Sequence, residues 1–180
     1  MVFVQEVKDA AGYGYTYSKT VRLVNGKPQM VLEHRLKNTG TRPIVTDLYN
    51  HNFLVLDHLP PSPGYSIAFP FDIKTDRPPK PEMAKIEGEK IIYEKTLSGQ
   101  DTVAFPIEGF SNSAKDYDFR IEDPAAGAGI RVRGDRPILR AGLWSIRSVV
   151  AVEPYITLSI QPGQEFTWNL TYDFYPVPAR

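Results

Sequence analysis

Proline and glycine interrupt this 180-residue chain along its whole length, at 16 and 13 positions respectively. Both residues mark turns, and the segments between them are dominated by Val, Ile, Thr, Tyr and Phe, which favour β-strands. We find no convincing helical segment. The sequence therefore predicts an all-β protein.

Two stretches indicate strands that are joined by short turns. Residues 19–38 contain two strand-like runs that meet at Asn25-Gly26, a pair that supplies the positive φ angles of a tight hairpin. His34 shares the two-residue period of the leucines around it, so we expect it to point inward. Residues 153–175 show a second hairpin with an apolar stripe. Turn counting gives about ten antiparallel strands, which close most simply as a sandwich.

Size and charge limit the classes of partner. We expect residues 1–180 to form a single domain. Basic and acidic residues balance at 21 each, so no single-sign field attracts nucleic acid or an anionic membrane, and a neutral partner is expected. The chain has no cysteine, which excludes a disulfide framework and thiolate catalysis. Residues 1–15 lack a signal-peptide pattern and no run is long enough to span a bilayer, so we expect a soluble, cytoplasmic protein.

One polar, proline-rich stretch stands apart from the strand pattern. Residues 74–90, "KTDRPPKPEMAKIEGEK", carry three prolines that cannot donate ladder hydrogen bonds. We expect this segment to be a long exposed loop.

The stretch "TDLYNHNFLVLDH" holds the first candidate for chemistry. Asn50, His51 and Asn52 interrupt an apolar, aromatic run in which each polar group needs a partner. Imidazole gives or takes a proton near neutral pH, so His51 is a candidate general acid or base. The alternative is a structural histidine that bonds to backbone. The two amides could hold a polyhydroxy ligand or cap a bulge.

Glu153 is the second candidate, because it is the only charged residue between Arg147 and Glu165. An acid in so apolar a run is rarely buried without a partner or a function. Pro154 leaves two structures open, since it could end one strand and place Glu153 at a loop mouth.

Metal and cofactor sites are not expected. The histidines and aspartates near His51 match no metal-ligand spacing, and no phosphate-binding loop or nucleophile elbow is present. Tyr13, Tyr15 and Tyr17 alternate along one face, where they could stack on sugar rings or pack across strands.

Three stretches carry a resemblance to a known family. The strand with the family's Asn-His motif resembles "RPIVTDLYNHNFLVLD", and the family segment with a sugar-contacting acid resembles "DFRIEDPAAGAGIRVRGDRPIL". The family's closing acid with its Pro-Gly turn resembles "VEPYITLSIQPGQEFTWNLTYDFY". The family is that of the galactose mutarotase-like proteins, the aldose 1-epimerase superfamily. The likeness runs from about Lys19 onward. It implies a large antiparallel β-supersandwich and no cofactor.

The resemblance also implies an activity, the interconversion of sugar anomers. By motif position Glu153 would be the base that takes the proton from the anomeric hydroxyl, and His51 the acid that protonates the ring oxygen. Asn50 and Asn52 would line the sugar site. His34, Asp118 and Trp144 complete the set of expected substrate-binding residues.

The chain departs from the family pattern at its N-terminal side. It resembles the C-terminal two-thirds of the fold, and neither the second active-site histidine nor the early arginine of the family can be assigned. His34 lies too near His51 in the chain to be the counterpart of that histidine. An incomplete sandwich has open sheet edges, so we expect a homodimer or a partner that covers them.

The sequence is compatible with three functions. The first is a mutarotase-like enzyme that acts on a small neutral sugar. The second is a carbohydrate-binding module without turnover, and the third is a structural or assembly domain. Fold alone does not decide among them.

Overall fold

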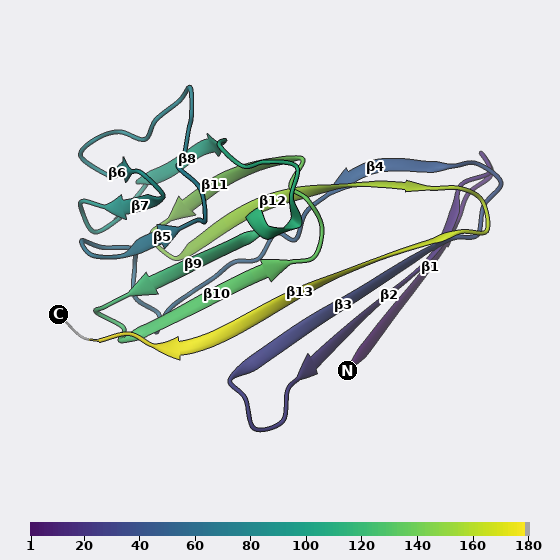
Figure 1. The fold of residues 1–180 in the computed structure, drawn as a ribbon, viewed down its shortest axis with the longest axis horizontal. Coiled ribbons are helices and arrows are strands. Elements are labelled where there is room, and N and C mark those ends of the chain that lie inside the picture. Colours follow the sequence, from purple (N-terminus) through teal and green to yellow (C-terminus); the bar gives the residue numbers. More distant parts are fainter. Residues whose placement is uncertain (179–180) are drawn as a thin grey trace.

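Two antiparallel β-sheets form the molecule (Figure 1). The computed structural model describes residues 1–178, in which thirteen strands build a sheet of nine and a sheet of four. The nine-stranded sheet has, in spatial order, β1 (Val2–Lys8), β2 (Gly14–Leu23), β3 (Gln29–Asn38), β13 (Glu165–Pro176), β10 (Ala128–Gly134), β9 (Asp118–Asp123), β5 (Ser66–Ala68), β7 (Lys90–Tyr93) and β6 (Ala84–Glu87). The four-stranded sheet has β4 (Ile44–Leu48), β12 (Val149–Ile160), β11 (Arg140–Ile146) and β8 (Thr102–Ile107). The all-β, antiparallel prediction is confirmed.

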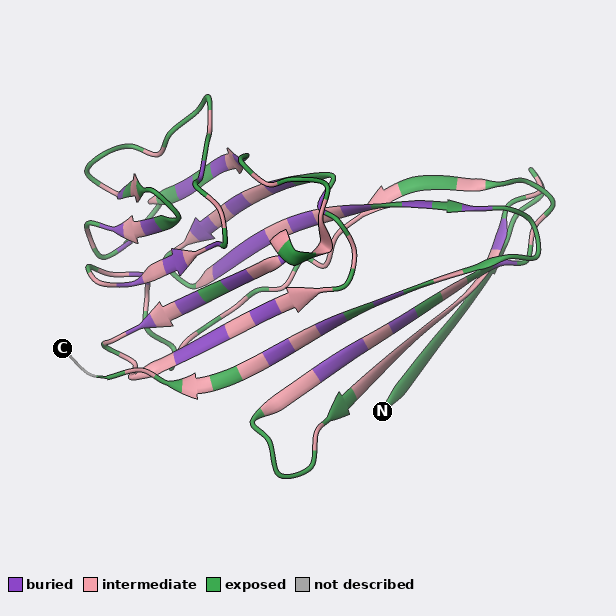
Figure 2. Ribbon diagram, viewed as in Figure 1, coloured by how far each residue is buried: buried purple, intermediate pink, exposed green. Residues whose placement is uncertain are grey.

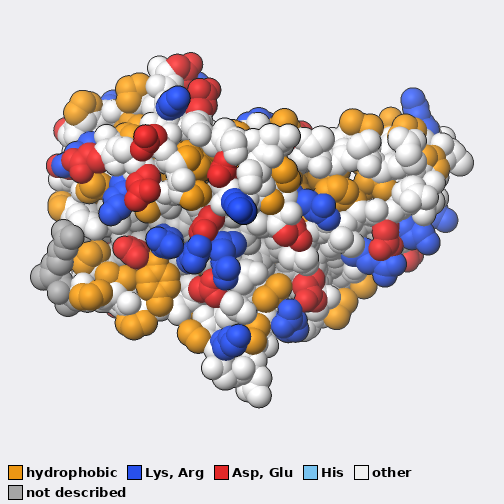
Figure 3. Space-filling view, viewed as in Figure 1, with side chains coloured by type: hydrophobic (Ala, Val, Ile, Leu, Met, Phe, Trp, Pro, Cys, Tyr) orange, Lys and Arg blue, Asp and Glu red, His pale blue; other side chains and the backbone are white. Residues whose placement is uncertain are grey.

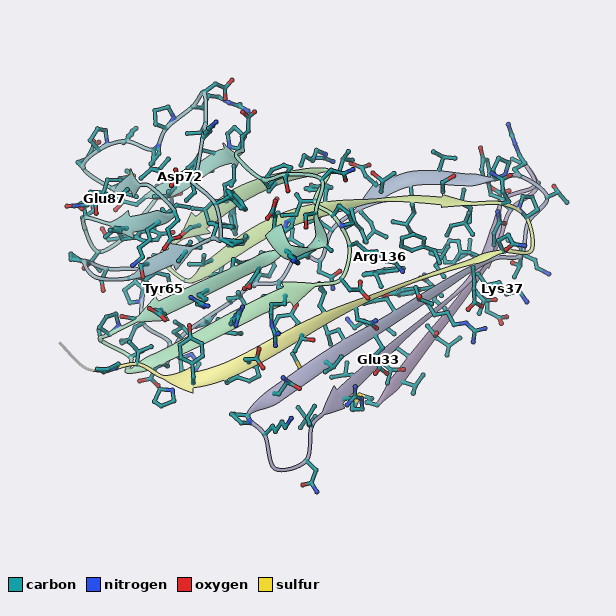
Figure 4. All side chains as sticks on the ribbon, in the orientation of Figure 1. Glu33, Lys37, Tyr65, Asp72, Glu87 and Arg136 are labelled. Atoms are coloured by element: carbon teal, nitrogen blue, oxygen red, sulfur yellow. The ribbon has the colours of Figure 1, made fainter. Side chains whose placement is uncertain are left out.

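The core lies between the two sheets and follows the two-residue period of the strands. Along β9, Phe119 and Ile121 are buried while Arg120 between them is exposed (Figure 2). Alternation of this kind is expected where one face of a sheet packs on a core and the other faces water. Side chains fill the space between the sheets (Figure 4), where the guanidinium of Arg136 lies 4.6 Å from the ring centre of Phe166.

The hairpin expected at Asn25-Gly26 is present, but its turn is wider than the predicted two-residue turn. The last register pair is Leu23 with Met30, and of the two turn residues only Gly26 has a positive φ, of 70°. The last backbone contact between the two strands is from the N–H of Val24 to the carbonyl of Gln29, at 3.0 Å, and the N–H of Lys27 closes the turn on the carbonyl of Val24 at 3.1 Å. The turn therefore spans residues 25–28 rather than the Asn-Gly pair alone.

The expectation of an unbroken loop over residues 74–90 is wrong in its second half. β6 occupies Ala84–Glu87 and pairs with β7 through a turn at Gly88, whose φ is 58°. The three prolines all precede β6, so they remove no hydrogen bond from its pairing. Ala84 is buried, and this contact with the core gives the short strand its place in the sheet.

Pro154 does not divide the strand in which it lies, so a loop mouth at Glu153 is excluded. β12 runs without a break from Val149 to Ile160.

Among residues 1–178, no helix is long and apolar enough to cross a membrane. The only helical element of that range is a single 3₁₀ turn at Ala114–Asp116.

Candidate active site

The candidate site lies where the chain segment 44–54 runs antiparallel to residues 150–160. β4 pairs with Ile156–Ile160, and Leu54 pairs with Val150 further along in the same register. The Leu54–Val150 pair exchanges two backbone hydrogen bonds, of 2.9 and 3.0 Å. Between these anchors, residues 49–53 form no ladder with β12.

Pro154 accounts for the gap in the ladder. Hydrogen-bonded and non-hydrogen-bonded pairs alternate along an antiparallel ladder. Because Leu54 and Val150 are a hydrogen-bonded pair, Asn50 and Pro154 fall at a hydrogen-bonded position of the same register, and proline has no N–H to give. The carbonyl of Asn50 accepts a hydrogen bond from the N–H of Asn52 instead, at 2.9 Å. The segment therefore bows at the Asn-His motif.

The two asparagines point inward and attach this segment to the opposite sheet. Nδ2 of Asn50 lies 3.4 Å from Nε2 of His34 on β3. Nδ2 of Asn52 donates a hydrogen bond to the hydroxyl of Tyr172 on β13. Both amides thus satisfy buried polar groups across the sandwich, and these contacts hold the segment against the nine-stranded sheet.

His34 is a core residue. Its side chain is buried, its ring stacks on Trp168 with centroids 4.7 Å apart, and its Nδ1 lies 2.6 Å from the hydroxyl of Tyr17. Burial lowers the pKa of His34 to about 4, and the positive charge of Lys19 acts in the same direction. The imidazole is therefore neutral at neutral pH. Its inward orientation is as the sequence predicts, and its ring lies buried between the two sheets.

His51 points to the other side of the segment, toward Glu153. The shared register places these two residues opposite each other at a non-hydrogen-bonded position, where facing side chains come closest. Nε2 of His51 lies 3.3 Å from Oε1 of Glu153. The side chain of His51 is 40% exposed and that of Glu153 is 18% exposed, so a ligand from solvent can reach both groups.

Aromatic rings surround this pair. The centroid of His51 lies 4.5 Å from Phe53, 5.4 Å from Tyr49 and 6.2 Å from Trp144. Tyr155 stacks on Tyr49 at 4.1 Å. Rings of this kind can stack on the apolar faces of sugars while the polar pair contacts hydroxyl groups.

An ion pair fixes one side of the aromatic rim. Arg140 lies over Tyr155, 3.4 Å from the ring centre, and its Nη2 is 2.7 Å from Oδ2 of Asp47. The hydrogen bond from Arg140 holds the pKa of Asp47 below its usual value. A hydrogen bond with Tyr155 raises the pKa of Tyr49, and burial and the charge of Glu153 act in the same direction.

Gly142 leaves free space beside the carboxylate. It lies opposite Glu153 in the β11–β12 ladder, between Arg140 and Trp144 on the same face. A Cβ at this position would meet the carbonyl oxygen of Phe105 at 3.8 Å, an ordinary van der Waals distance. The glycine therefore opens the face of the small sheet next to the polar pair.

Asp118 is not part of this cluster. It lies on the outer face of the nine-stranded sheet, opposite in orientation to the buried Phe119, and accepts a hydrogen bond of 2.8 Å from Nε of Arg131. Acidic and basic side chains are mixed over the face shown in Figure 3, so their charges largely cancel there. The expected substrate contact of Asp118 finds no support in this position. Trp144, in contrast, lies beside His51.

Sequence reasoning missed four residues of this face: Tyr49, Phe53, Gly142 and Tyr155. The alternation of residues 155–160 indicates that Tyr155 faces away from the core, but not what lies opposite it. Within residues 1–178, no group of three or more His, Asp or Glu side chains is placed to hold a metal ion.

The architecture is that of a galactose mutarotase-like β-sandwich. An aldose 1-epimerase-like protein from Klebsiella pneumoniae superposes with a TM-score of 0.68 at 15% identity, over 95% of this chain and 49% of that chain. An aldose 1-epimerase-like protein from Escherichia coli K12 gives 0.67 at 13% identity, over 98% and 65%. A galactose mutarotase-like protein from Lactobacillus casei gives 0.62 at 15% identity, over 97% and 69%.

Sequence comparison alone does not reach these proteins. No protein-family model matches the chain, and no curated protein matches it. The chain spans between 49% and 69% of the length of the three structures named above. At these identities the likeness is one of fold.

Proposed function

We propose that residues 1–180 act as a single β-sandwich domain that interconverts the anomers of a small neutral sugar, with Glu153 as general base and His51 as general acid. The observation that carries this proposal is the 3.3 Å contact between Nε2 of His51 and Oε1 of Glu153 on an exposed, aromatic face. The galactose mutarotase-like fold supports it.

The chemistry requires a base and an acid that lie close together. Glu153 takes the proton of the anomeric hydroxyl, the bond from C1 to the ring oxygen breaks, and protonated His51 gives its proton to that oxygen. Rotation about C1–C2 and the reverse transfers give the other anomer and restore both groups. The two reacting oxygens are bonded to the same carbon, so a neighbouring carboxylate and imidazole can serve them in one complex.

The surrounding residues suit a sugar rather than a charged substrate. Trp144, Phe53 and Tyr49 offer ring faces, and Gly142 leaves room next to the carboxylate. The positive charge of Arg140 at the rim of this face is already paired with Asp47. A neutral aldose therefore fits this face without disturbing that ion pair.

The test is the rate at which freshly dissolved α-glucose and α-galactose reach anomeric equilibrium, followed by proton NMR or polarimetry. Glu153→Gln and His51→Asn are each expected to reduce the protein's acceleration by about 100-fold or more, the usual size of an acid or base contribution. Glu108→Gln and His58→Asn are matched controls at exposed positions and should leave it unchanged. If the wild-type protein accelerates neither sugar, the proposal fails.

A second function, sugar binding without turnover, is favoured by the exposure of His51. Enzyme sites generally exclude water from the reacting groups, whereas this pair lies on an open sheet face. A sugar that raises the melting temperature without changing its own anomeric equilibration rate would select this function. If no sugar changes either the melting temperature or its own equilibration rate, the remaining function is that of a structural or assembly domain.

The proposal includes the oligomeric state and the cellular location of the chain. The chain forms a homodimer that covers an open sheet edge, as light scattering can test. It acts in the cytoplasm. Cell fractionation tests this location.

A further inference from the structure

Strand β1 forms one edge of the nine-stranded sheet and is exposed at every one of its residues (Figure 2). Four of its seven side chains are large and apolar. Val2, Phe3, Val4 and Val7 are 63%, 50%, 64% and 38% exposed. Apolar side chains gathered on an edge strand mark a surface that pairs with another strand.

The backbone of β1 offers hydrogen-bonding groups at alternate residues. Met1 and Val21 exchange two backbone hydrogen bonds, of 2.8 and 2.9 Å, so they form a hydrogen-bonded pair. By alternation along the β1–β2 register, Phe3, Gln5 and Val7 also direct their backbone groups to β2. The N–H and C=O groups of the even-numbered residues Val2, Val4, Glu6 and Lys8 consequently point away from the sheet.

Among residues 1–178, the other three sheet edges carry features that discourage pairing. β8 contains Pro106, which lacks an N–H. β6 is four residues long and exposes Lys85 and Glu87. β4 is five residues long and follows Pro43 directly. Short length, charge and proline all block edge-to-edge association. β1 carries Glu6 and Lys8, but it has neither a proline nor a short length.

We propose that β1 pairs antiparallel with β1 of a second copy of this chain, around a two-fold axis at Gln5. This inference rests on the homodimer proposed above and names its interface. Free groups on both copies belong to even-numbered residues, so only registers that pair even with even residues satisfy them. An axis at Gln5 meets this condition and overlaps the whole of Val2–Lys8.

The same register matches the side chains. It places Phe3 of one copy opposite Val7 of the other on the face shared with Tyr15 and Tyr17, and brings the two Gln5 amides together. An axis at Val4 would also satisfy the backbone, but it would place Phe3 opposite Gln5. Apolar cross-strand pairs are the more stabilising arrangement.

A single strand pair makes a small interface. Interfaces at the low end of the size range are weak or transient, so we expect a dissociation constant of about 1–100 μM. The association should therefore be followed over a wide concentration range.

The chain has no cysteine, so single cysteines report the register directly. Gln5→Cys would place two thiols at facing non-hydrogen-bonded positions, close enough for a disulfide under mild oxidation. Val4→Cys tests the alternative axis. Val45→Cys, at a 70% exposed valine on the edge strand β4, is the matched control. Light scattering on the unmodified chain, of 20.3 kDa, gives the mass.

The expected result is a mass that rises with protein concentration toward twice the mass of one chain. Gln5→Cys should form a crosslinked dimer, whereas Val4→Cys and Val45→Cys should not. A dimer that crosslinks through Val4→Cys or Val45→Cys, or through none of the three, would overturn the interface while leaving the homodimer in place. A monomer at all concentrations would overturn both. Anomer exchange by a monomer would show that the sugar chemistry does not depend on this edge.

Discussion

His51 lies opposite Glu153 in the antiparallel register that joins residues 44–54 to 150–160, and their side chains meet at 3.3 Å. The backbone ladder is missing at this point because Pro154 cannot donate to Asn50. One residue therefore explains both the bowed Asn-His motif and the polar pair at its tip.

Pro154→Ala should close this gap. An alanine supplies the missing N–H toward the carbonyl of Asn50, so residues 49–53 can join the ladder. We expect the stability to change by no more than about 1 kcal/mol. Any sugar turnover should fall about tenfold or more, because His51 would shift. Hydrogen exchange of the amide that the substitution introduces measures the closure. A rapidly exchanging amide together with unchanged turnover would contradict this account.

Gly142→Val should block the site without unfolding the protein. A Cβ here meets its neighbour at an uncrowded 3.8 Å, and a β-branched residue suits a strand. The side chain would fill the space beside Glu153, so sugar binding and turnover should both be lost. A melting temperature equal to or above that of the wild type would show that the fold is intact. Full binding by the variant would mean that the ligand lies elsewhere.

His34 makes the stability of the fold depend on pH. Its pKa falls from 6.5 to about 4 on folding, so the unfolded state binds more protons between these values. The stabilising effect of the neutral imidazole is complete above about pH 6.5 and is lost as the pH falls toward 4, with a size of up to about 3 kcal/mol. His34→Gln removes the titration. Urea unfolding at pH 7 and pH 4.5 should therefore show a smaller pH effect for the variant than for the wild type.

Asn52 and Tyr172 should be coupled in stability, because the amide of Asn52 donates to the buried hydroxyl. Asn52→Ala leaves the buried hydroxyl of Tyr172 without its partner, and Tyr172→Phe leaves the half-buried amide of Asn52 without its partner. Each loss costs about 1–3 kcal/mol. The double variant should lose less than the two single losses combined, by about 0.5–3 kcal/mol. Urea denaturation of the four proteins gives this coupling. Strict additivity would show that the contact does not tie the segment to β13.

Local patterns were sufficient for several elements and misleading at two. The hairpin at Asn25-Gly26 and the alternating strand after Pro154 follow from neighbours within a few residues. The register between β2 and β3 sets the width of that hairpin, and the strand β6 depends on its pairing with β7. Both of these outcomes depend on pairing, which a local pattern does not contain.

The sequence by itself determined the antiparallel β class, the inward orientation of His34 and the choice of His51 and Glu153 as candidates. Strand propensity, two-residue alternation and a polar residue inside an apolar run are all local properties. Tertiary structure decided the rest. It directs Asn50 and Asn52 into the sandwich, His51 outward and Asp118 to another face. The register between distant segments sets which residues meet, and that register depends on the packing of two whole sheets.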